Sequence, residues 1–256
     1  MSVEKIHASK KGKLSDKWSS YLSHYDKLFS PIKDKNINLL EIGVQNGGSL
    51  ETWASYFAQG LNFIGCDVNK KCSDLKFEDE RIKLIIGHIN SKESFEAVRN
   101  LNLFFDIIID DGSHLSTDII SSFILYFPML KPGGVFIVED AHTLYFNNYL
   151  GGLYNENSAQ KFFHKLTDII NYEFWKNHYP LESILQNWFR GGEIPKFIQD
   201  GWVESILFSN SLITIYKSNI ATHNKLGSRN ITGNEALVSK DALELKKKLQ
   251  ESKGNL

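Results

Sequence analysis

Apolar residues in this chain gather in short continuous runs, and glycine-containing turns or amphipathic stretches separate one run from the next. The runs have the length and continuity of buried β-strands, and they cover residues 37–44, 62–68, 82–89, 105–111 and 135–140. Apolar residues spaced by three and four positions predict helices over 16–32, 49–59, 91–101 and 116–130. Strands that alternate with helices of about 10–15 residues form parallel sheets, so the pattern predicts an α/β fold with a doubly wound, mostly parallel sheet.

Polar residues mark the ends of several of these helices. Ser49 suits the N-cap of the helix at 49–59, and Ser91, followed by Ser94 and Glu96, gives the helix at 91–101 a capping-box start. The turn Lys-Pro-Gly-Gly at 131–134 stops the preceding helix. The order of strands and helices is therefore well marked as far as residue 140.

The later part of the chain has a different pattern. Residues 143–200 are rich in Tyr, Phe, Trp and Asn, and within them 158–175 has helical spacing. Two apolar runs in 202–218 flank Ser209-Asn210-Ser211 and predict a C-terminal antiparallel β-hairpin, while 241–253 predicts a short exposed helix. The expected organisation is a flexible N-terminus over 1–15, one domain over 16–218 that contains the insert 143–200, and a polar tail over 219–256.

Composition and charge narrow the classes of function. A formal net charge of −1 over 256 residues gives no global basic field for nucleic acid or an anionic membrane. The two cysteines, Cys66 and Cys72, are too few for a metal quartet and fit a reducing compartment. No apolar run approaches the roughly 18 residues of a membrane span, and the polar N-terminus lacks the apolar segment of a signal peptide. We expect a cytoplasmic protein with no membrane span and no nucleic-acid partner.

The first two predicted strands end in residues suited to a nucleoside ligand. In a doubly wound sheet, ligands bind at the carboxyl ends of the strands. The first strand leads into EIGVQNGGS, where Gly43 and Gly47 allow a tight turn, but the stretch lacks both the GxGxxG pattern and a phosphate-binding loop. Asp67 ends the second strand, 20 residues after Gly47 (67 − 47), and a carboxylate there can accept hydrogen bonds from both ribose hydroxyls.

Carboxylates gather at the ends of the fourth and fifth strands. DIIIDDGSH, residues 106–114, places two adjacent aspartates and a histidine after a run of isoleucines. Clustered like charges are costly to desolvate, so a metal ion, a cationic ligand or solvent exposure must compensate for Asp110 and Asp111. Glu139 and Asp140 end the next strand and can lie beside them.

The chain resembles the class I S-adenosylmethionine-dependent methyltransferases, which have a Rossmann-like fold. The shared motifs are LLEIGVQNGGSLETW, FIGCDVN, FDIIIDDGSH, LKPGGVFIVED and the closing hairpin. More narrowly, it is similar to the metal-dependent sugar O-methyltransferases of antibiotic biosynthesis, the mycinamicin-type macrolide and rhamnosyl enzymes with their cephalosporin-hydroxylase-like relatives. SDKW…HYDKLF, EDAHTLY and VESILFSNSLITIYK match that group, and the resemblance covers about residues 15–218.

The resemblance implies S-adenosylmethionine as the methyl donor. The glycine-rich turn of the family corresponds to Glu41, Gly43 and Gly47, near the methionyl part of the cofactor, and its ribose carboxylate corresponds to Asp67. We therefore expect the turn after the first strand and the aspartate after the second strand to contact the cofactor as they do in the family.

The chain departs from the family after the third strand. Where the family usually has Gly-Asp-Gln, this sequence has Gly87-His88-Ile89-Asn90, so His88, Asn90 or a backbone amide is expected to contact adenine. Asp110 is also assigned to the cofactor site. Its alternative roles are to hold a neighbouring site residue in place or to cap a helix.

Asp111, Glu139 and Asp140 together suggest a Mg²⁺ site. Three converging carboxylates supply the oxygen ligands that Mg²⁺ prefers, and catechol O-methyltransferases resemble this layout. Such an ion lowers the pKa of a bound hydroxyl and orients it toward the methyl group.

His114 and His142 are the candidates for the general base. Both follow a strand that ends in aspartate, and His114 is preferred because it lies three residues past Asp111. Aromatic residues of the insert are candidates for stacking on a sugar, although core packing is an alternative for at least half of them: Tyr145, Tyr149, Tyr154, Trp175 and Trp188.

The predicted activity is Mg²⁺-dependent O-methylation of a sugar hydroxyl on a nucleotide-activated sugar, a surface glycan precursor or a glycosylated natural product. The alternatives are a non-catalytic cofactor-binding or scaffold protein of the same fold and a methyltransferase for a non-sugar small molecule. A nicotinamide dehydrogenase would need GxGxxG after the first strand, which is absent. The resembling sugar enzymes are oligomers, which leaves a homo-oligomer open for this chain.

Overall fold

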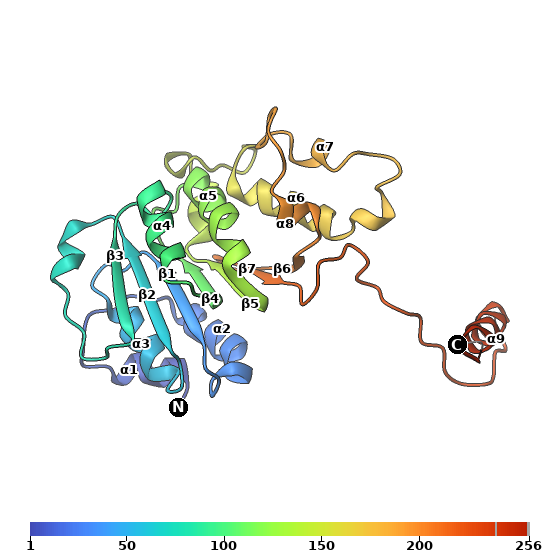
Figure 1. The fold of residues 1–256 in the computed structure, drawn as a ribbon, viewed down its shortest axis with the longest axis horizontal. Coiled ribbons are helices and arrows are strands. Elements are labelled where there is room, and N and C mark those ends of the chain that lie inside the picture. Colours follow the sequence, from blue (N-terminus) through green and yellow to red (C-terminus); the bar gives the residue numbers. More distant parts are fainter. Residues whose placement is uncertain (239, 255–256) are drawn as a thin grey trace. The chain divides into compact units, whose positions relative to one another are not determined.

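A seven-stranded sheet organises residues 1–223, which form one unit of the chain (Figure 1). The computed structural model describes residues 1–238 and 240–254, and residues 224–256 form a second unit. The strand order is β3-β2-β1-β4-β5-β7-β6, in which β1 to β5 are parallel and β7 runs antiparallel to both β5 and β6. The bounds are Asn38–Ile42 for β1, Asn62–Asp67 for β2, Ile82–Ile86 for β3, Phe105–Asp110 for β4, Leu130–Val138 for β5, Val203–Ser209 for β6 and Leu212–Lys217 for β7.

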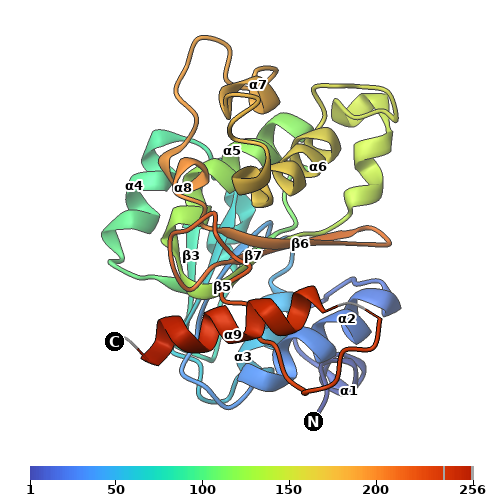
Figure 2. The same cartoon turned by 90° about the vertical axis from the view of Figure 1, so that its right-hand side faces the viewer.

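Helices cover both faces of the sheet, as Figure 2 shows. One face is covered by α1 (Val3–Ser9), α2 (Ser19–Phe29) and α3 (Gly48–Tyr56). The other face is covered by α4 (Lys92–Asn100), α5 (Ser116–Tyr126), α6 (Ala159–Ile170), α7 (Glu182–Leu185) and α8 (Lys196–Gln199), while α9 (Asp241–Gly254) belongs to the second unit.

The buried strands explain the continuous apolar runs of the sequence. Leu39 and Ile107 pack toward α1–α3, whereas the next residues, Leu40 and Ile108, pack toward α4–α8, and all four side chains are fully buried. Because side chains alternate along a strand, a sheet covered on both faces needs an apolar residue at every position.

The predicted fold class is confirmed by this sheet. The five predicted parallel strands and the C-terminal hairpin are present, and the helix expected at 241–253 corresponds to α9. Ser91 caps α4 by accepting a hydrogen bond from the Ser94 amide. Ser49, in contrast, is not the N-cap of α3, because Gly47 at a φ of +81° takes that position and Ser49 lies inside the helix.

The N-terminal segment differs from the flexible arm expected over 1–15. Val3 in α1 is fully buried, and its amide donates to Asp26 Oδ1 at 2.6 Å. Residues 10–18, named the strap here, connect α1 to α2, which begins at Ser19 rather than at residue 16. None of the helices in the described part of the chain has the length and apolar content of a membrane span.

Candidate active site

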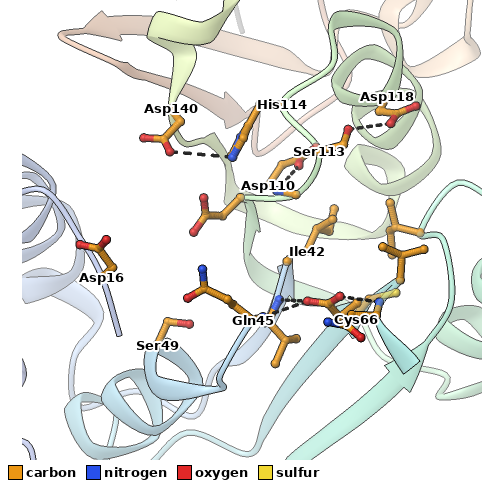
Figure 3. Close-up of a pocket in the computed structure, with 18 of the residues that line it drawn as sticks. Asp16, Ile42, Gln45, Ser49, Cys66, Asp110, Ser113, His114, Asp118 and Asp140 are labelled. Atoms are coloured by element: carbon orange, nitrogen blue, oxygen red, sulfur yellow. Dashed lines mark hydrogen bonds and ion pairs between the residues drawn. The ribbon is translucent and has the colours of Figure 1, made fainter. Parts of the chain in front are cut away.

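The carboxyl ends of the parallel strands form the edge of the sheet at which the site lies. Backbone amides just past the strands keep these ends level by donating to the neighbouring strand: Gly43 N to Cys66 O, Gly87 N to Asp67 O, Asp111 N to Ile42 O and Glu139 N to Asp110 O, at 2.8–2.9 Å. A cavity of about 450 Å³ lies at this edge, lined by the segments that follow β1 to β5 and by strap residues 14–17 (Figure 3).

The turn after β1 forms one wall of the cavity. Gly43 has a φ of +90°, and a Cβ atom built on it would lie 2.0 Å from the carbonyl oxygen of Asp111, so only glycine fits. Asp67 lines the cavity beside this turn. Its carboxylate accepts hydrogen bonds from the amides of Val44, Gln45 and Asn69 at 2.7–2.9 Å, which occupy three of its roughly four acceptor positions.

Gly47 and Glu41, both predicted to face the cofactor, do not line the cavity. A Cβ atom on Gly47 would meet the ring of Phe77, so this glycine is needed for packing. Glu41 is fully buried below the turn, where its carboxylate accepts from Ser49 Oγ at 2.7 Å and from Trp53 Nε1 at 3.2 Å. The strand alternation explains this position, because Glu41 points into the α3 face while Ile42 points to the cavity.

The segment after β3 places His88 on the cavity and Asn90 beside it. His88 Nε2 lies 3.6 Å from Asp118 Oδ2, and Ser113 Oγ donates to the same oxygen at 2.6 Å. Asn90 does not line the cavity; its Nδ2 donates to the backbone of Asp118, and its Oδ1 is buried with no hydrogen-bond partner in the described part of the chain. His88, Ser113 and Asp118 thus form the polar wall at this end.

Asp111, His114 and Asp140 converge at the other end of the cavity. Within residues 1–238 and 240–254, these three each offer a ligand atom within 4.8 Å of the others, and His114 Nε2 lies 3.8 Å from Asp140 Oδ2 (Figure 3). His114 and Asp140 adopt φ values of +58° and +51°, which non-glycine residues rarely do and which often mark functional sites. Asp140 is also held by Tyr21 and Trp18, which donate to its Oδ1 at 2.8 and 3.2 Å.

Glu139, predicted as the third metal ligand, has other partners in the structure. It is 1 % exposed, and its two oxygens accept from Lys17 Nζ at 2.8 Å, while Tyr25 donates to Oε1 at 2.6 Å. Lys17 Nζ also lies 2.5 Å from Asp111 Oδ2. Burial opposes the charge of Lys17, but the carboxylates of Glu139, Asp111 and Glu41 outweigh it and raise the pKa of Lys17. The set that could hold a metal thus contains His114 in place of Glu139.

Asp110 differs from its neighbour Asp111 in its surroundings. Its side chain is 4 % exposed and accepts from Ser122 Oγ in α5 and from the Gly112 amide at 3.3 Å. Burial raises the pKa of Asp110 to about 6. Although Asp110 lines the cavity, these bonds fix its carboxylate against α5, which is the supporting role considered for it.

As the pH rises from 5 to 8, the free energy of unfolding of the Glu41→Gln variant is expected to increase relative to that of the native chain. Burial raises the pKa of Glu41 to about 7, so the folded chain retains a proton that the unfolded chain loses near pH 4.3. The free energy of unfolding of the native chain therefore decreases as the pH rises from the unfolded to the folded pKa, and Glu41 accounts for about 2–3 kcal/mol of this decrease. Glutamine does not titrate, so the variant lacks this contribution. Chemical unfolding at both pH values measures the difference.

Glu51 provides a control of opposite sign for this experiment. Burial acts to raise its pKa, but hydrogen bonds from Lys10 and Lys13 outweigh it and lower the pKa of Glu51. Its contribution is fully present above the unfolded pKa of about 4.3 and is lost only below it, so Glu51→Gln should be less stable than the native chain by a similar amount at pH 5 and at pH 8. The same pH response in both variants would contradict the assignment.

The two candidate bases lie in different positions. His114 lines the cavity, whereas His142 does not, and His142 Nδ1 makes a 2.6 Å hydrogen bond with Ser211 Oγ. Among the predicted stacking residues, Trp175 and Trp188 pack against the core and donate to backbone carbonyls. Tyr145 and Tyr154 are exposed, and the Tyr149 ring lies 6.4 Å from that of His114.

Two groups of site residues were missed by the sequence analysis. Of the strap residues 14–17, the first two fall in the segment expected to be flexible and the last two at the start of the helix predicted over 16–32, so none was assigned to a site. Asp118 lies in the first turn of α5, beyond the strand end at which ligand residues are sought. Trp18 is one of the apolar residues whose spacing predicts the helix over 16–32, yet it is 62 % exposed and contacts Asp140.

The strand order and the closing antiparallel pair define the class I S-adenosylmethionine-dependent methyltransferase fold, and this chain has that fold. The MycE methyltransferase of the mycinamycin biosynthetic pathway, solved with Mg and SAH, superposes with a TM-score of 0.63 at 25 % identity, covering 82 % of this chain and 52 % of that one. No protein-family model matches the chain.

The curated relatives are sugar O-methyltransferases, as the motifs of the sequence indicated. An 8-demethyl-8-alpha-L-rhamnosyl tetracenomycin-C 2'-O-methyltransferase of Streptomyces olivaceus is 34 % identical over 146 residues, covering 54 % of this chain and 38 % of the relative. A mycinamicin VI 2''-O-methyltransferase of Micromonospora griseorubida is 34 % identical over 138 residues, covering 51 % and 34 %. The chain thus spans little more than a third of the length of these relatives.

Proposed function

We propose that this chain is an S-adenosylmethionine-dependent O-methyltransferase that acts on a sugar hydroxyl with the help of Mg²⁺. One observation carries the proposal: a single cavity joins the Gly43–Asp67 wall to the cluster of Asp111, His114 and Asp140. A methyl donor bound at the first part would lie next to a polar cluster that can receive a hydroxyl group.

The cofactor part of the cavity fits a nucleoside. Its volume of about 450 Å³ lies within the range of about 300–1,000 Å³ typical of small-molecule sites. Gly43 allows close approach of a ligand to the backbone, Asp67 offers its remaining acceptor position to a ribose hydroxyl, and His88 and Asp118 line the same cavity. S-adenosylmethionine, when bound, supplies a methyl group on a sulfonium ion.

The acceptor part fits a divalent cation. Asp111 and Asp140 bring two carboxylates and His114 a ring nitrogen, with ligand atoms close enough to share one ion. The solved MycE methyltransferase contains Mg, which favours that ion here. When bound, the ion would acidify and orient the acceptor hydroxyl.

The protein side chains supply position and proton transfer. Tyr21 and Trp18 hold Asp140, and Lys17 holds Asp111, so the acceptor end of the cavity is fixed before any ligand binds. His114 is the proposed acceptor of the hydroxyl proton because its ring faces this cavity, whereas His142 is engaged with Ser211.

The proposed acceptor is a sugar of a glycosylated natural product, which the names of the relatives support. Exposed aromatic rings of Trp18, Tyr145 and Phe146 lie on the segments next to Asp140 and can stack on the apolar face of a sugar. Transfer of a labelled methyl group to rhamnosylated natural products, with sugar nucleotides as the competing acceptors, tests the function. Absence of transfer to any sugar in the presence of Mg²⁺ would refute it.

Replacing Asp67 with alanine is expected to weaken binding of S-adenosylhomocysteine by about 30–1,000-fold. The change removes the charge-assisted hydrogen bond that Asp67 offers to ribose and releases the amides of Val44 and Gln45 from their present position, which together cost about 2–4 kcal/mol. Isothermal calorimetry measures the affinity, with Lys131→Met, which removes a pair with Asp106 away from the cavity, as the control variant. Equal affinities of the Asp67 variant and the native chain would remove Asp67 from the ribose site.

A further inference from the structure

The strap is attached to the domain by lysine–carboxylate pairs at both ends. At its start, Lys10 and Lys13 lie 2.8 and 3.1 Å from the carboxylate of Glu51 in α3, and the Lys13 amide donates to the same group at 2.8 Å. At its end, Lys17 reaches Asp111 and Glu139. The two attachments lie on either side of strap residues 14–16.

Lys17 is the more strongly fixed of these attachments. Its side chain is 4 % exposed, and its ammonium group lies within 4.0 Å of three carboxylates, those of Asp111, Glu139 and Glu41. Removing this one cation would leave buried negative groups without compensation, so the closed position of the strap is coupled to the charge balance of the site.

The middle of the strap forms part of the cavity wall. Leu14, Ser15 and Asp16 line it together with Lys17, and Figure 3 shows Asp16 on a separate segment at the left of the view. A Cβ atom on Gly48 would lie 2.2 Å from the carbonyl oxygen of Leu14, so the strap packs directly on the first turn of α3.

The hydroxyl group of Ser15 is a buried polar group at the cavity wall. Its Oγ is shielded from solvent and has no hydrogen-bond partner within the part of the chain that the structure describes. A buried polar atom of this kind is costly unless a ligand or an ordered water satisfies it. Asp16, next to it, adds a carboxylate suited to a cationic group.

We propose that the strap is a wall of the cofactor site, that Lys17 is the positioning residue that holds it closed, and that Ser15 and Asp16 contact the bound cofactor. The inference rests on the proposed function for the identity of the ligand. S-adenosylmethionine and its demethylated product both carry an α-ammonium and an α-carboxylate, and these groups suit Asp16 and the Ser15 hydroxyl respectively.

Limited trypsin digestion tests the closed position, because Lys10, Lys11 and Lys13 are cleavage sites within the strap that the native chain and the Lys17 variant share. In the absence of ligand, the Lys17→Met variant should be cut in the strap about tenfold or more faster than the native chain. Lys131→Met is the matched control, since it removes a 2.8 Å pair with Asp106 and leaves the strap unchanged. Equal strap cleavage in the native chain and the Lys17 variant would overturn the role of Lys17.

A second variant distinguishes release of the strap from unfolding of the whole domain. Lys17→Met leaves Glu139 and Asp111 without their cation, so Lys17→Met combined with Glu139→Gln reduces that unbalanced charge. The double variant should keep a cooperative unfolding transition and still show fast strap cleavage. Protection of its strap to the native level would overturn the proposal.

S-adenosylhomocysteine tests the cofactor contacts. It should slow strap cleavage of the native chain, and Ser15→Ala should weaken its binding about threefold to tenfold, the loss of one hydrogen bond, without changing cleavage of the free chain. Binding without strap protection would overturn this inference and leave the proposed function standing. Failure of the native chain to bind S-adenosylhomocysteine would refute the proposed function, whereas the ligand-free comparison of Lys17 variants does not depend on it.

Discussion

The His114→Ala variant is expected to transfer methyl groups about 10²–10⁴-fold more slowly than the native chain, with little change in cofactor affinity. The imidazole lines the acceptor end of the cavity and lies 3.8 Å from Asp140, in a backbone conformation with a φ of +58° that the surrounding turn must maintain. Single-turnover kinetics with labelled cofactor measures the methyl-transfer step, and calorimetry measures cofactor binding.

His142→Ala is the control for this prediction. His142 follows β5 as His114 follows β4, but it is 41 % exposed and bonds to Ser211 outside the cavity, so its loss should leave the rate near normal. A slow His142 variant with a normal His114 variant would reverse the assignment. Near-normal rates in both would mean that the metal site suffices without a side-chain base.

The role of His114 as base or as metal ligand can be separated in the same variant. If the imidazole mainly holds the ion, raising the Mg²⁺ concentration should restore the rate of His114→Ala, because the weakened site fills again. If it accepts the hydroxyl proton, excess Mg²⁺ should not help, and the rate should instead rise with pH as hydroxide replaces the base. A chelator should abolish activity of the native chain in either case.

The Gly43→Ala variant is expected to lose cofactor binding and about 3–5 kcal/mol of folding stability. Its added Cβ would lie 2.0 Å from the backbone oxygen of Asp111, and neither the turn nor the end of β4 can move without disturbing the sheet ladder. Strain at a φ of +90° adds to this overlap. Denaturant unfolding and calorimetry with S-adenosylhomocysteine measure the two losses.

Gly191→Ala separates strain from overlap. Gly191 also has a positive φ, +70°, but a Cβ there meets nothing within 4 Å. Its substitution should cost about 1 kcal/mol and leave cofactor binding unchanged. Similar losses at the two positions would show that contact with the Asp111 backbone is not what makes Gly43 necessary.

The strand ends were predictable because they depend on local pattern. Continuous apolar runs mark parallel strands, and the residues that follow them must meet at one edge, so Asp111 and Asp140 were expected to lie near each other and do. His114 was placed in the same cleft for the same reason. The fold class follows from this regular alternation alone.

The strap could not be predicted from the same signals. Residues 10–15 have no apolar period, and residues 16–18 were assigned to the following helix. The conformation of the strap depends on pairs between residues far apart in the chain, since Lys17 meets Asp111 and Glu139, which lie 94 and 122 positions away. Glu139 was assigned to the metal on its residue type, but its partners are set by Tyr25 and Lys17 on neighbouring elements. Local pattern carries no information on which of several adjacent carboxylates a distant cation will reach.

Asp110 and Asp111 show how little freedom the chain has to change its length near β4. The first carboxylate bonds to Ser122 of α5 and the second to Lys17 of the strap, on opposite sides of the sheet. Inserting or deleting one residue within β4 would exchange the sides to which successive side chains point. The carboxylate that meets Lys17 would then be buried against α5, and the carboxylate that meets Ser122 would point toward Lys17. Insertions should therefore be tolerated in the exposed turns around residues 191–192 but not between 105 and 111, a contrast that a library of single-residue insertions would reveal.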